Sequence, residues 1–342
     1  MEGRPLIQLG WGVVGTGAIA GDFLHALSVS ERCRVVNVVG SSPSKARGFA
    51  DLWRVPRASA TLDELLGDPA VEAIYVATPH PQHEAAAFAA ITARKHVLCE
   101  KPMATEAAGA ARILTAARGA GVFVMEAFMY RCHPLLAQLA RQVGEGAIGP
   151  VRHVRASFGF RARRDPASRL FDPALGGGGI LDVGGYPASF ARLIAGIAVG
   201  KPYAEPVTLE ASGFVGPTGV DELATAQLSF SSGVTATLEC AVRHELGTAV
   251  TVFGETGHIE APNPWTPGGQ RHGLESSFSI HRDGRAPELV TVRTPRSIYA
   301  LQAELVADTL PALEAPWPAM GWEDTLGNMR LLDQWRAALS AD

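Results

Sequence analysis

The chain has 342 residues, of which 47% are apolar and 19% charged, and 30 basic against 34 acidic side chains give a net charge of −4. The length favours two domains, the composition excludes a disordered or fibrous chain, and the charge balance argues against nucleic acid as a partner. The start, Met1 to Pro5, lacks the apolar core of a secretory signal, and no apolar run approaches the roughly 18 residues of a membrane span, so we expect a cytoplasmic protein with no membrane partner.

Short apolar strands alternate with helical patterns through the first part of the chain. We predict strands over residues 9–15, 34–40, 73–77, 96–99 and 122–127, with helices over 81–93 and 104–119. Regular alternation of strand and helix is typical of parallel strands joined by crossover helices. The sequence therefore predicts an α/β N-terminal domain, residues 1–130, built as a Rossmann-type, doubly wound parallel sheet that binds a dinucleotide.

The pattern changes after a predicted helix near residues 134–146. Apolar and polar residues then alternate in stretches separated by Gly-containing turns, and two helical patterns close the chain. We predict strands over 151–160, 207–215, 223–230, 235–242 and 248–253 and helices over 298–313 and 321–339. This alternation indicates a largely antiparallel sheet, so residues 131–342 are expected to form an α+β domain for substrate binding and oligomerisation, with the last helix packing back on the first domain. The Pro- and Gly-rich loop 262–273 is either a cleft wall or an ordinary surface loop.

A glycine-rich motif, Gly15-Thr16-Gly17-Ala18-Ile19-Ala20, directly follows the first predicted strand. It fits the pattern G-x-G-x-x-A and opens a helix in the first strand-helix unit of an alternating chain. The first glycine permits a tight turn, the second lets a pyrophosphate approach the backbone, and the helix N-terminus supplies partial positive charge. This placement predicts a dinucleotide-binding site.

The second predicted strand ends where the adenosine ribose of a dinucleotide would lie. The stretch that follows carries Ser41, Ser42, Lys45 and Arg47, and no carboxylate appears before Asp51. Hydroxyl and cationic groups can hold a 2′-phosphate, whereas NAD enzymes commonly place an acidic residue on the 2′-hydroxyl. We therefore expect NADP as the cofactor, with NAD as the alternative, and contacts from Ser41, Ser42 and Lys45.

Two further segments follow strands of the same predicted sheet. Thr78-Pro79-His80-Pro81-Gln82-His83 comes after the third strand, and Glu100-Lys101-Pro102 comes after the fourth. Because ligands bind outside the carboxyl ends of the strands in a doubly wound sheet, both segments are expected to converge on the cofactor with the Gly15 loop. Pro81 between the two histidines and the lack of further nearby ligands favour packing against the cofactor, so no metal is expected.

A second glycine-rich segment runs from Gly176 to Gly179 and leads into the stretch 180–186. If 180–186 are helical, Gly184 and Gly185 mark a close approach of the backbone, and Asp182 and Tyr186 lie four residues apart on one face. An acidic and a phenolic group that point the same way suit proton transfer. The alternative is a carboxylate at a helix N-terminus beside a half-buried tyrosine.

A basic cluster lies upstream of this segment. It consists of Arg161, Arg163, Arg164 and Arg169, with Asp165 and Asp172 interleaved. Mixed charges at this spacing predict a salt-bridged surface loop and not a nucleic-acid patch.

Together these motifs resemble the glucose-fructose oxidoreductase, inositol dehydrogenase and rhizopine-catabolism (Gfo/Idh/MocA) family of nicotinamide-dependent oxidoreductases. The resemblance covers nearly the whole chain. It rests on the Gly15 loop, Thr78-Pro79, Glu100-Lys101-Pro102, Met125 to Arg131, Gly176 to Tyr186, and Trp322 to Arg330. Tyr186, where inositol dehydrogenases are expected to carry His, points to the branch of dimeric dihydrodiol dehydrogenase and xylose dehydrogenase. NADP-using members of this branch often carry Arg where this chain has Ser42.

The resemblance implies an NADP-dependent oxidoreductase that transfers a hydride between the nicotinamide and a secondary alcohol or hemiacetal carbon of a sugar or cyclic diol. By the same resemblance Lys101 and Tyr186 hydrogen-bond the reacting oxygen, and Asp182 orients the sugar or the lysine. Tyr186 is the preferred proton carrier, and the sequence leaves Lys101 open as the final acid/base. We expect the Lys101 ammonium to favour the Tyr186 phenolate and so to lower its pKa.

The same family implies a substrate pocket and an assembly. Met129, Arg131 and Phe160 are candidates for the substrate pocket, and a homodimer or a dimer of dimers is expected. Two alternatives stay open. One is a regulator of this fold that binds the dinucleotide without turnover, and the other is a cofactor-dependent glycosidase.

Overall fold

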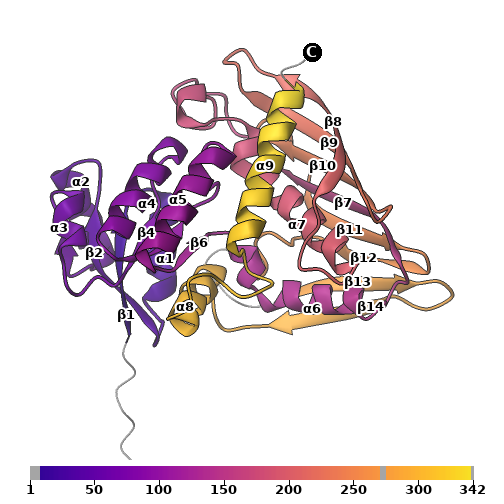
Figure 1. Ribbon diagram of the computed structural model, residues 1–342, viewed down its shortest axis with the longest axis horizontal. Helices are drawn as coiled ribbons and strands as arrows, with labels where there is room; N and C mark the ends of the chain where they lie inside the picture. The colour runs from indigo at the N-terminus through magenta and orange to yellow at the C-terminus, as the bar shows by residue number, and fades with distance from the viewer. Residues whose placement is uncertain (1–7, 270–274, 340–342) are drawn as a thin grey trace, which may run out of the picture.

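Six parallel strands form the first sheet, in the order β3-β2-β1-β4-β5-β6, in a computed structural model that describes residues 8–269 and 275–339 (Figure 1). The strands are β1 Leu9–Val14, β2 Cys33–Val39, β3 Arg57–Ala58, β4 Ala73–Val76, β5 His96–Cys99 and β6 Val124–Glu126. The helices of this half are α1 Ala18–Leu27, α2 Pro43–Trp53, α3 Leu62–Leu66, α4 His83–Thr92 and α5 Ala107–Ala120. Strands β1 and β4 are buried along their whole length, as expected of a sheet covered on both faces.

Eight strands form the second sheet within the described part of the chain, in the order β14-β13-β12-β11-β7-β10-β9-β8. The pair β7 and β10 is parallel, and the other neighbours are antiparallel. The strands are β7 Val151–Gly159, β8 Pro206–Val215, β9 Asp221–Phe230, β10 Thr235–Ala241, β11 Thr248–Gly254, β12 Gly257–Ala261, β13 Glu275–Arg282 and β14 Glu288–Arg293. The predicted fold class, a Rossmann domain followed by an α+β domain on a largely antiparallel sheet, is confirmed.

The helices of the second half lie between the two sheets. They are α6 Pro134–Gly144, α7 Gly185–Ile197, α8 Ile298–Thr309 and α9 Trp322–Leu339. Helices α6, α7 and α9 cover the face of the second sheet that is turned toward the first, whereas no helix of the described residues covers its opposite face (Figure 1). We call this uncovered side the open face.

Helix α9 runs along the junction between the two sheets (Figure 1). Asp333 Oδ2 accepts the Ala107 backbone N–H at 2.8 Å, and Trp322 Nε1 donates to the Val124 carbonyl at 2.9 Å. The C-terminal helix thereby bonds both α5 and β6 of the first half. None of the helices among the described residues has the length and apolar character to cross a membrane.

Three parts of the fold differ from the elements expected from the sequence. Helix α8 ends at Thr309 and not at 313, because Pro311 has no N–H and disfavours helix in the residue before it. Strands β12 to β14 are unpredicted additions to the sheet. In the predicted loop 262–273, residues 262–269 are described and bring Trp265 to full burial in the core, while 270–273 lie outside the described residues.

Candidate active site

The glycine-rich loop between β1 and α1 lies at the carboxyl end of the first sheet. Gly15 has φ +120°, and a Cβ there would lie 2.4 Å from the Ala77 carbonyl oxygen, just past the end of β4. Only glycine therefore permits the turn and its close approach to the neighbouring strand. A Cβ at Gly17 would meet nothing within 4 Å, so this side of the loop is open. The N–H groups of the first turn of α1 are consequently available to an anion such as a phosphate.

A cavity of about 880 Å³ extends along this edge of the sheet. The three segments that the sequence predicts to converge all line it, namely 15–19, 78–83 except Pro81, and Glu100-Lys101. The buried hydroxyl of Thr78 has no hydrogen-bond partner among the described residues, which leaves it for a bound molecule. The turn, the helix N-terminus and this hydroxyl fit a nicotinamide dinucleotide.

The serines after β2 differ in where they point. Ser41 and Lys45 line the cavity, next to Gly40 at the end of the strand. Ser42 does not line it, because its Oγ accepts the Lys45 backbone N–H at 3.3 Å and caps α2. Of the three predicted ribose contacts, the structure therefore brings two to the cavity.

Lys101 and Asp182 meet at the wall of the cavity. Lys101 Nζ donates to the backbone oxygen of Asp182 at 2.5 Å and lies 3.7 Å from Oδ1 of the same residue. Arg169 Nη1 donates to that Oδ1 at 2.8 Å. Burial alone would raise the pKa of Asp182, but the ammonium of Lys101 and the guanidinium of Arg169 outweigh it and hold the pKa below its ordinary value. An ionised carboxylate thus lies between two cations at this end of the cavity.

Arg169 is a site residue that the sequence analysis places in a surface loop. Its neighbour Arg164 fits that expectation, because it pairs with Glu222 through Nη2 and Oε2 at 2.5 Å. Arg169 lines the cavity instead. Nothing in the spacing of the basic cluster distinguishes the two arginines, and only the fold brings Arg169 to Asp182.

The two histidines of the segment after β4 are buried against main-chain oxygens. His80 Nδ1 lies 3.1 Å from the Gly176 carbonyl, and His83 has Nδ1 2.8 Å from the Pro102 carbonyl and Nε2 2.8 Å from the Thr78 carbonyl. Burial lowers the pKa of His80 to about 3, so its ring is neutral and Nδ1–H donates. Burial also lowers the pKa of His83, and this effect outweighs the two carbonyl contacts, which raise it. Both His83 nitrogens face the protein, which leaves only its ring carbons for the predicted cofactor contact.

Tyr186 lies directly behind Lys101 and does not belong to the cavity lining. Lys101 Nζ is 5.3 Å from the centroid of the Tyr186 ring, whose side chain is only 3% exposed. Its hydroxyl donates to Met129 Sδ at 3.5 Å. Aromatic side chains enclose the ring at centroid distances of 5.1 to 5.8 Å, namely Phe128, Tyr130, Phe158 and Trp265.

This enclosure decides the ionisation of Tyr186. Burial raises its pKa well above the ordinary value, and the nearby Glu100 adds to the rise. The lowering expected from the Lys101 ammonium is therefore wrong. Loss of water around a phenolate costs more than a cation recovers when that cation faces the ring and not the oxygen.

The second glycine-rich segment and a carboxylate from β9 fix the start of the helix that carries Asp182 and Tyr186. Gly178 has φ +111°, and a Cβ there would lie 2.2 Å from Asp221 Oδ1. Asp221 Oδ2 accepts the Ile180 backbone N–H at 2.7 Å, and burial raises the pKa of this carboxyl to about 6. Residues Ile180–Gly184 form a single π-helical turn that continues into α7, so the condition set on the sequence, that 180–186 are helical, is met.

The predicted close approach at Gly184 and Gly185 takes the form of tight packing against side chains. A Cβ at Gly185 would lie 2.9 Å from the ring of Phe128, and one at Gly184 would lie 3.2 Å from the Cys240 sulfur. The helix can therefore pack directly on the aromatic wall behind Lys101.

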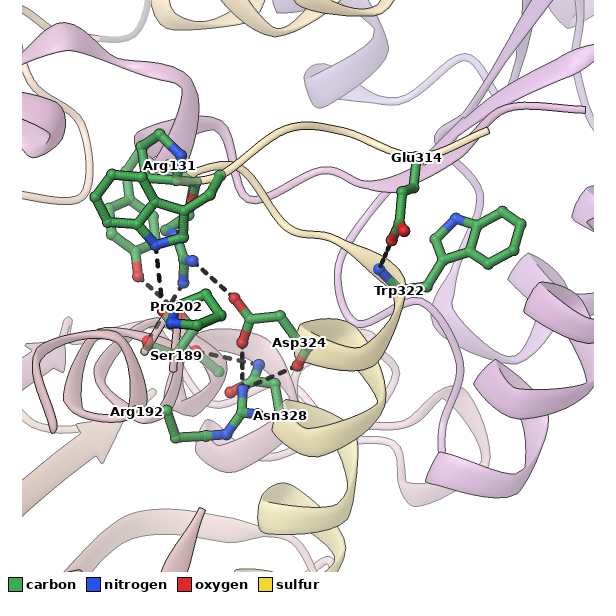
Figure 2. Close-up of polar contacts among 12 residues, drawn as sticks. Arg131, Ser189, Arg192, Pro202, Glu314, Trp322, Asp324 and Asn328 are labelled. Atoms are coloured by element: carbon green, nitrogen blue, oxygen red, sulfur yellow. Dashed lines mark hydrogen bonds and ion pairs between the residues drawn. The ribbon is translucent and has the colours of Figure 1, made fainter. Parts of the chain in front are cut away.

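Arg131, expected in the substrate pocket, lies elsewhere. Figure 2 shows Arg131 and Arg192 converging on Asp324 at the start of α9. Arg131 Nη2 lies 2.7 Å from Asp324 Oδ2, and its Nε donates to the Pro318 carbonyl at 2.5 Å. The guanidinium is fully buried in this ion-pair network, so the structure corrects the prediction and gives Arg131 a role at the junction of α9.

The other two substrate candidates also separate. Phe160 packs in a small apolar cluster with Phe171, Val220 and Val242. Met129 contacts the Tyr186 hydroxyl. Of the three predicted substrate residues, Met129 alone lies next to the predicted catalytic groups.

The Rossmann sheet, the glycine turn and the Lys101 site define a nicotinamide-dependent oxidoreductase. Residues 9–128 match the family model of oxidoreductases with an NAD-binding Rossmann fold, GFO_IDH_MocA, and residues 136–260 match the GFO/IDH/MocA C-terminal domain. The chain therefore belongs to the GFO/IDH/MocA family, and the predicted family, enzyme class and nicotinamide cofactor are confirmed.

Relatives of known activity share most of this chain. Trans-1,2-dihydrobenzene-1,2-diol dehydrogenase from Mus musculus is 36% identical over 263 residues, which is 76% of this chain and 77% of the mouse protein. The 3-ketoreductase KijD10 from Actinomadura kijaniata, solved with NADP and TDP-benzene, has a TM-score of 0.85 at 27% identity over 97% of this chain and 98% of its own. Aldose-aldose oxidoreductase from Caulobacter crescentus, solved with glycerol, has a TM-score of 0.84 at 25% identity over 98% of both chains.

Proposed function

We propose that this protein is an NADP-dependent oxidoreductase whose substrate is a sugar or a cyclic diol. It transfers a hydride between the nicotinamide and a secondary alcohol carbon or hemiacetal carbon of that substrate, and so interconverts the alcohol and the carbonyl compound. The observation that carries the proposal is the Lys101 ammonium, held by Asp182 at the wall of the dinucleotide cavity. The relatives named for diol and aldose oxidoreduction support this substrate class.

The preference for NADP rests on the residues that follow β2. Ser41 and Lys45 line the cavity there, and no carboxylate occupies residues 40–50. A hydroxyl and an ammonium favour a 2′-phosphate, and a carboxylate would repel it. The NADP bound in the KijD10 structure supports the same preference.

The protein residues divide the handling of the reacting oxygen and its proton. When bound, the nicotinamide accepts or supplies the hydride. The Lys101 ammonium has three N–H donors. One donates a hydrogen bond to the Asp182 carbonyl, and the others can hydrogen-bond and polarise the substrate oxygen. Tyr186, behind Lys101, keeps its proton because its pKa is raised, and the family resemblance supports the assignment that it passes that proton to the oxygen when a carbonyl is reduced. Asp182 stays ionised and positions Lys101.

A spectrophotometric screen tests the proposal. Aldoses, inositols, 1,5-anhydrosugars and cyclic diols are offered with NADP and with NAD, and the nicotinamide absorbance is followed. We expect net NADPH formation with at least one of these alcohols. Absorbance that never changes, although NADP binds, would instead support the regulator. Turnover of a glycoside without net NADPH would support the glycosidase.

The assembly and location are part of the proposal. The open face carries exposed apolar side chains, including Phe214 at 51% exposure and Leu289 at 68%, on a broad sheet that a second copy of the chain can cover. We therefore assign it to a homodimer, or to one interface in a dimer of dimers. The four cysteines are all free thiols, which supports a reducing, cytoplasmic setting.

A further inference from the structure

Strands β12 and β13 are neighbours in the second sheet (Figure 1). On the open face of these two strands, three side chains of types that can bind a metal lie close together. His258 and Glu260 are two residues apart on β12 and flank the buried Ile259, so both side chains point away from the core. His281 on β13 is the direct cross-strand partner of His258. Cross-strand partners have Cβ atoms about 5 Å apart, close enough for two imidazoles to share one ion.

The distances between the ligand atoms suit a small cation. His258 Nε2 lies 3.6 Å from Glu260 Oε1, and His281 Nε2 lies 3.9 Å from Glu260 Oε2. One ligand atom from each residue lies within 4.8 Å of the other two. Tetrahedral zinc with ligands at 2.0 to 2.2 Å needs separations of about 3.3 Å. The side chains are 34%, 52% and 31% exposed in chain order, so shifts of about 1 Å meet little resistance from packing.

Neighbouring side chains on the same face also contact the two imidazoles. The His258 and His281 rings are stacked, 4.4 Å apart and 4° from parallel, so one ring must turn before the in-plane lone pairs of both can reach a single ion. The Ser279 hydroxyl lies 2.9 Å from His281 Nε2, and it must give up this contact when a metal binds. Phe253 packs on the other side of His258, at 5.9 Å between centroids.

We propose that His258, Glu260 and His281 form a binding site for a late first-row divalent metal ion such as Zn²⁺, with water as a further ligand. Two imidazoles and one carboxylate are the donor set that such ions share. The bound ion would join β12 to β13 on the side of the sheet opposite α7. It is therefore separate from the oxidoreductase site and takes no part in its chemistry. The sequence pattern did not show it, because neither strand was predicted.

Calorimetric titration of Zn²⁺ into the chelator-treated, dialysed full-length protein tests this site. We expect one ion per chain, and an affinity at least tenfold weaker in each of His258→Ala, His281→Ala and Glu260→Gln. His153→Ala is the matched control. His153 lies on β7, its side chain is on the open face like those of the cluster, and it is not part of the cluster. The His153→Ala variant should therefore bind zinc as tightly as the wild type.

Each other outcome counts against the proposal. Absence of binding to the wild-type protein overturns it, and so does equal weakening by His153→Ala, which would indicate scattered surface histidines. Circular dichroism verifies that each variant is folded. If a histidine variant unfolds, the test uses Glu260→Gln and the visible absorption spectrum of bound Co²⁺ instead. A tetrahedral Co²⁺ band that is the same in Glu260→Gln as in the wild type also overturns the proposal. Turnover by the oxidoreductase should be the same in all variants.

Discussion

Replacing Tyr186 by Phe separates proton transfer from packing. The change removes one hydroxyl, which donates a 3.5 Å hydrogen bond to Met129 Sδ, and it leaves the contacts of the aromatic ring in place. We therefore expect the free energy of unfolding to fall by less than about 1 kcal/mol. If the hydroxyl supplies the proton, kcat for carbonyl reduction should fall by about 10² to 10⁴, which is about 2.7 to 5.4 kcal/mol of activation free energy.

Tyr130 provides a matched control for this variant. It is equally buried, at 1% exposure against 3% for Tyr186, and the two rings are neighbours at 5.8 Å between centroids. Its hydroxyl bonds Ser189 Oγ at 2.7 Å, so Tyr130→Phe should lower stability by about 1 kcal/mol and leave kcat near the wild-type value. Single-turnover reduction at saturating NADPH, with a separate NADPH titration, measures the chemical step apart from cofactor binding.

The pH profile makes the same test independently. Because the pKa of Tyr186 is raised, the phenol stays protonated at neutral pH, and carbonyl reduction should not depend on its titration there. Alcohol oxidation needs the phenolate, so its rate should rise about tenfold per pH unit and show no plateau at about pH 10, the ordinary pKa of tyrosine, and Tyr186→Phe should abolish that slope. A folded Tyr186→Phe enzyme with near wild-type turnover and an unchanged slope refutes this reasoning and leaves Lys101 as the proton carrier.

The remaining predictions concern the cofactor, Asp182 and the open face. In a binding titration, Ser41→Asp should shift the cofactor preference from NADP toward NAD by at least tenfold, about 1.4 kcal/mol. Ser42→Asp should shift the preference less, because the side chain at position 42 caps α2 and does not face the cavity. Equal shifts in the two variants would contradict this. Arg169→Met removes one of the two cations beside Asp182, so the pKa of that carboxyl should rise and the acid limb of kcat/KM should move to higher pH; an unmoved limb contradicts it. Phe214→Glu should dissociate the proposed homodimer, as measured by light scattering, and a monomeric wild-type protein would exclude that dimer.

The first sheet could be predicted because its signals are local. Each strand except the two-residue β3, which was not predicted, is a short apolar run, and the residues that follow β1, β4 and β5 include the cavity residues Gly15, Thr78 and Lys101. The convergence of these segments follows from the topology of a parallel sheet, so chain order was sufficient. In the second sheet the three strands at one edge, β12 to β14, were missed, although β13 places Phe278 and Ile280 in the core at alternating positions.

The site residues that were not predicted from the sequence owe their positions to contacts between segments that are far apart in the chain. Arg169 differs from the other arginines of its loop only in reaching Asp182, and Trp265 reaches Tyr186 from a segment that reads as an irregular loop. Arg131 was expected in the substrate pocket because of its place in a motif, but its partner Asp324 lies 193 residues away. Sequence spacing carries no information on such pairs.

Asp182 and Tyr186 show how one helix start can hold two titratable groups in opposite states. Both are buried, and burial alone would raise both pKa values. Two cations approach Asp182, with Arg169 Nη1 at 2.8 Å from its carboxylate, so attraction wins and the group is ionised. Lys101 meets the Tyr186 ring face at 5.3 Å from the centroid, so desolvation wins and the phenol keeps its proton. Divergence of this kind separates the roles of neighbouring acids. Asp182 can anchor Lys101 but has no proton to give, so the proposed proton source for carbonyl reduction is Tyr186, and Lys101 is the alternative that Tyr186→Phe tests.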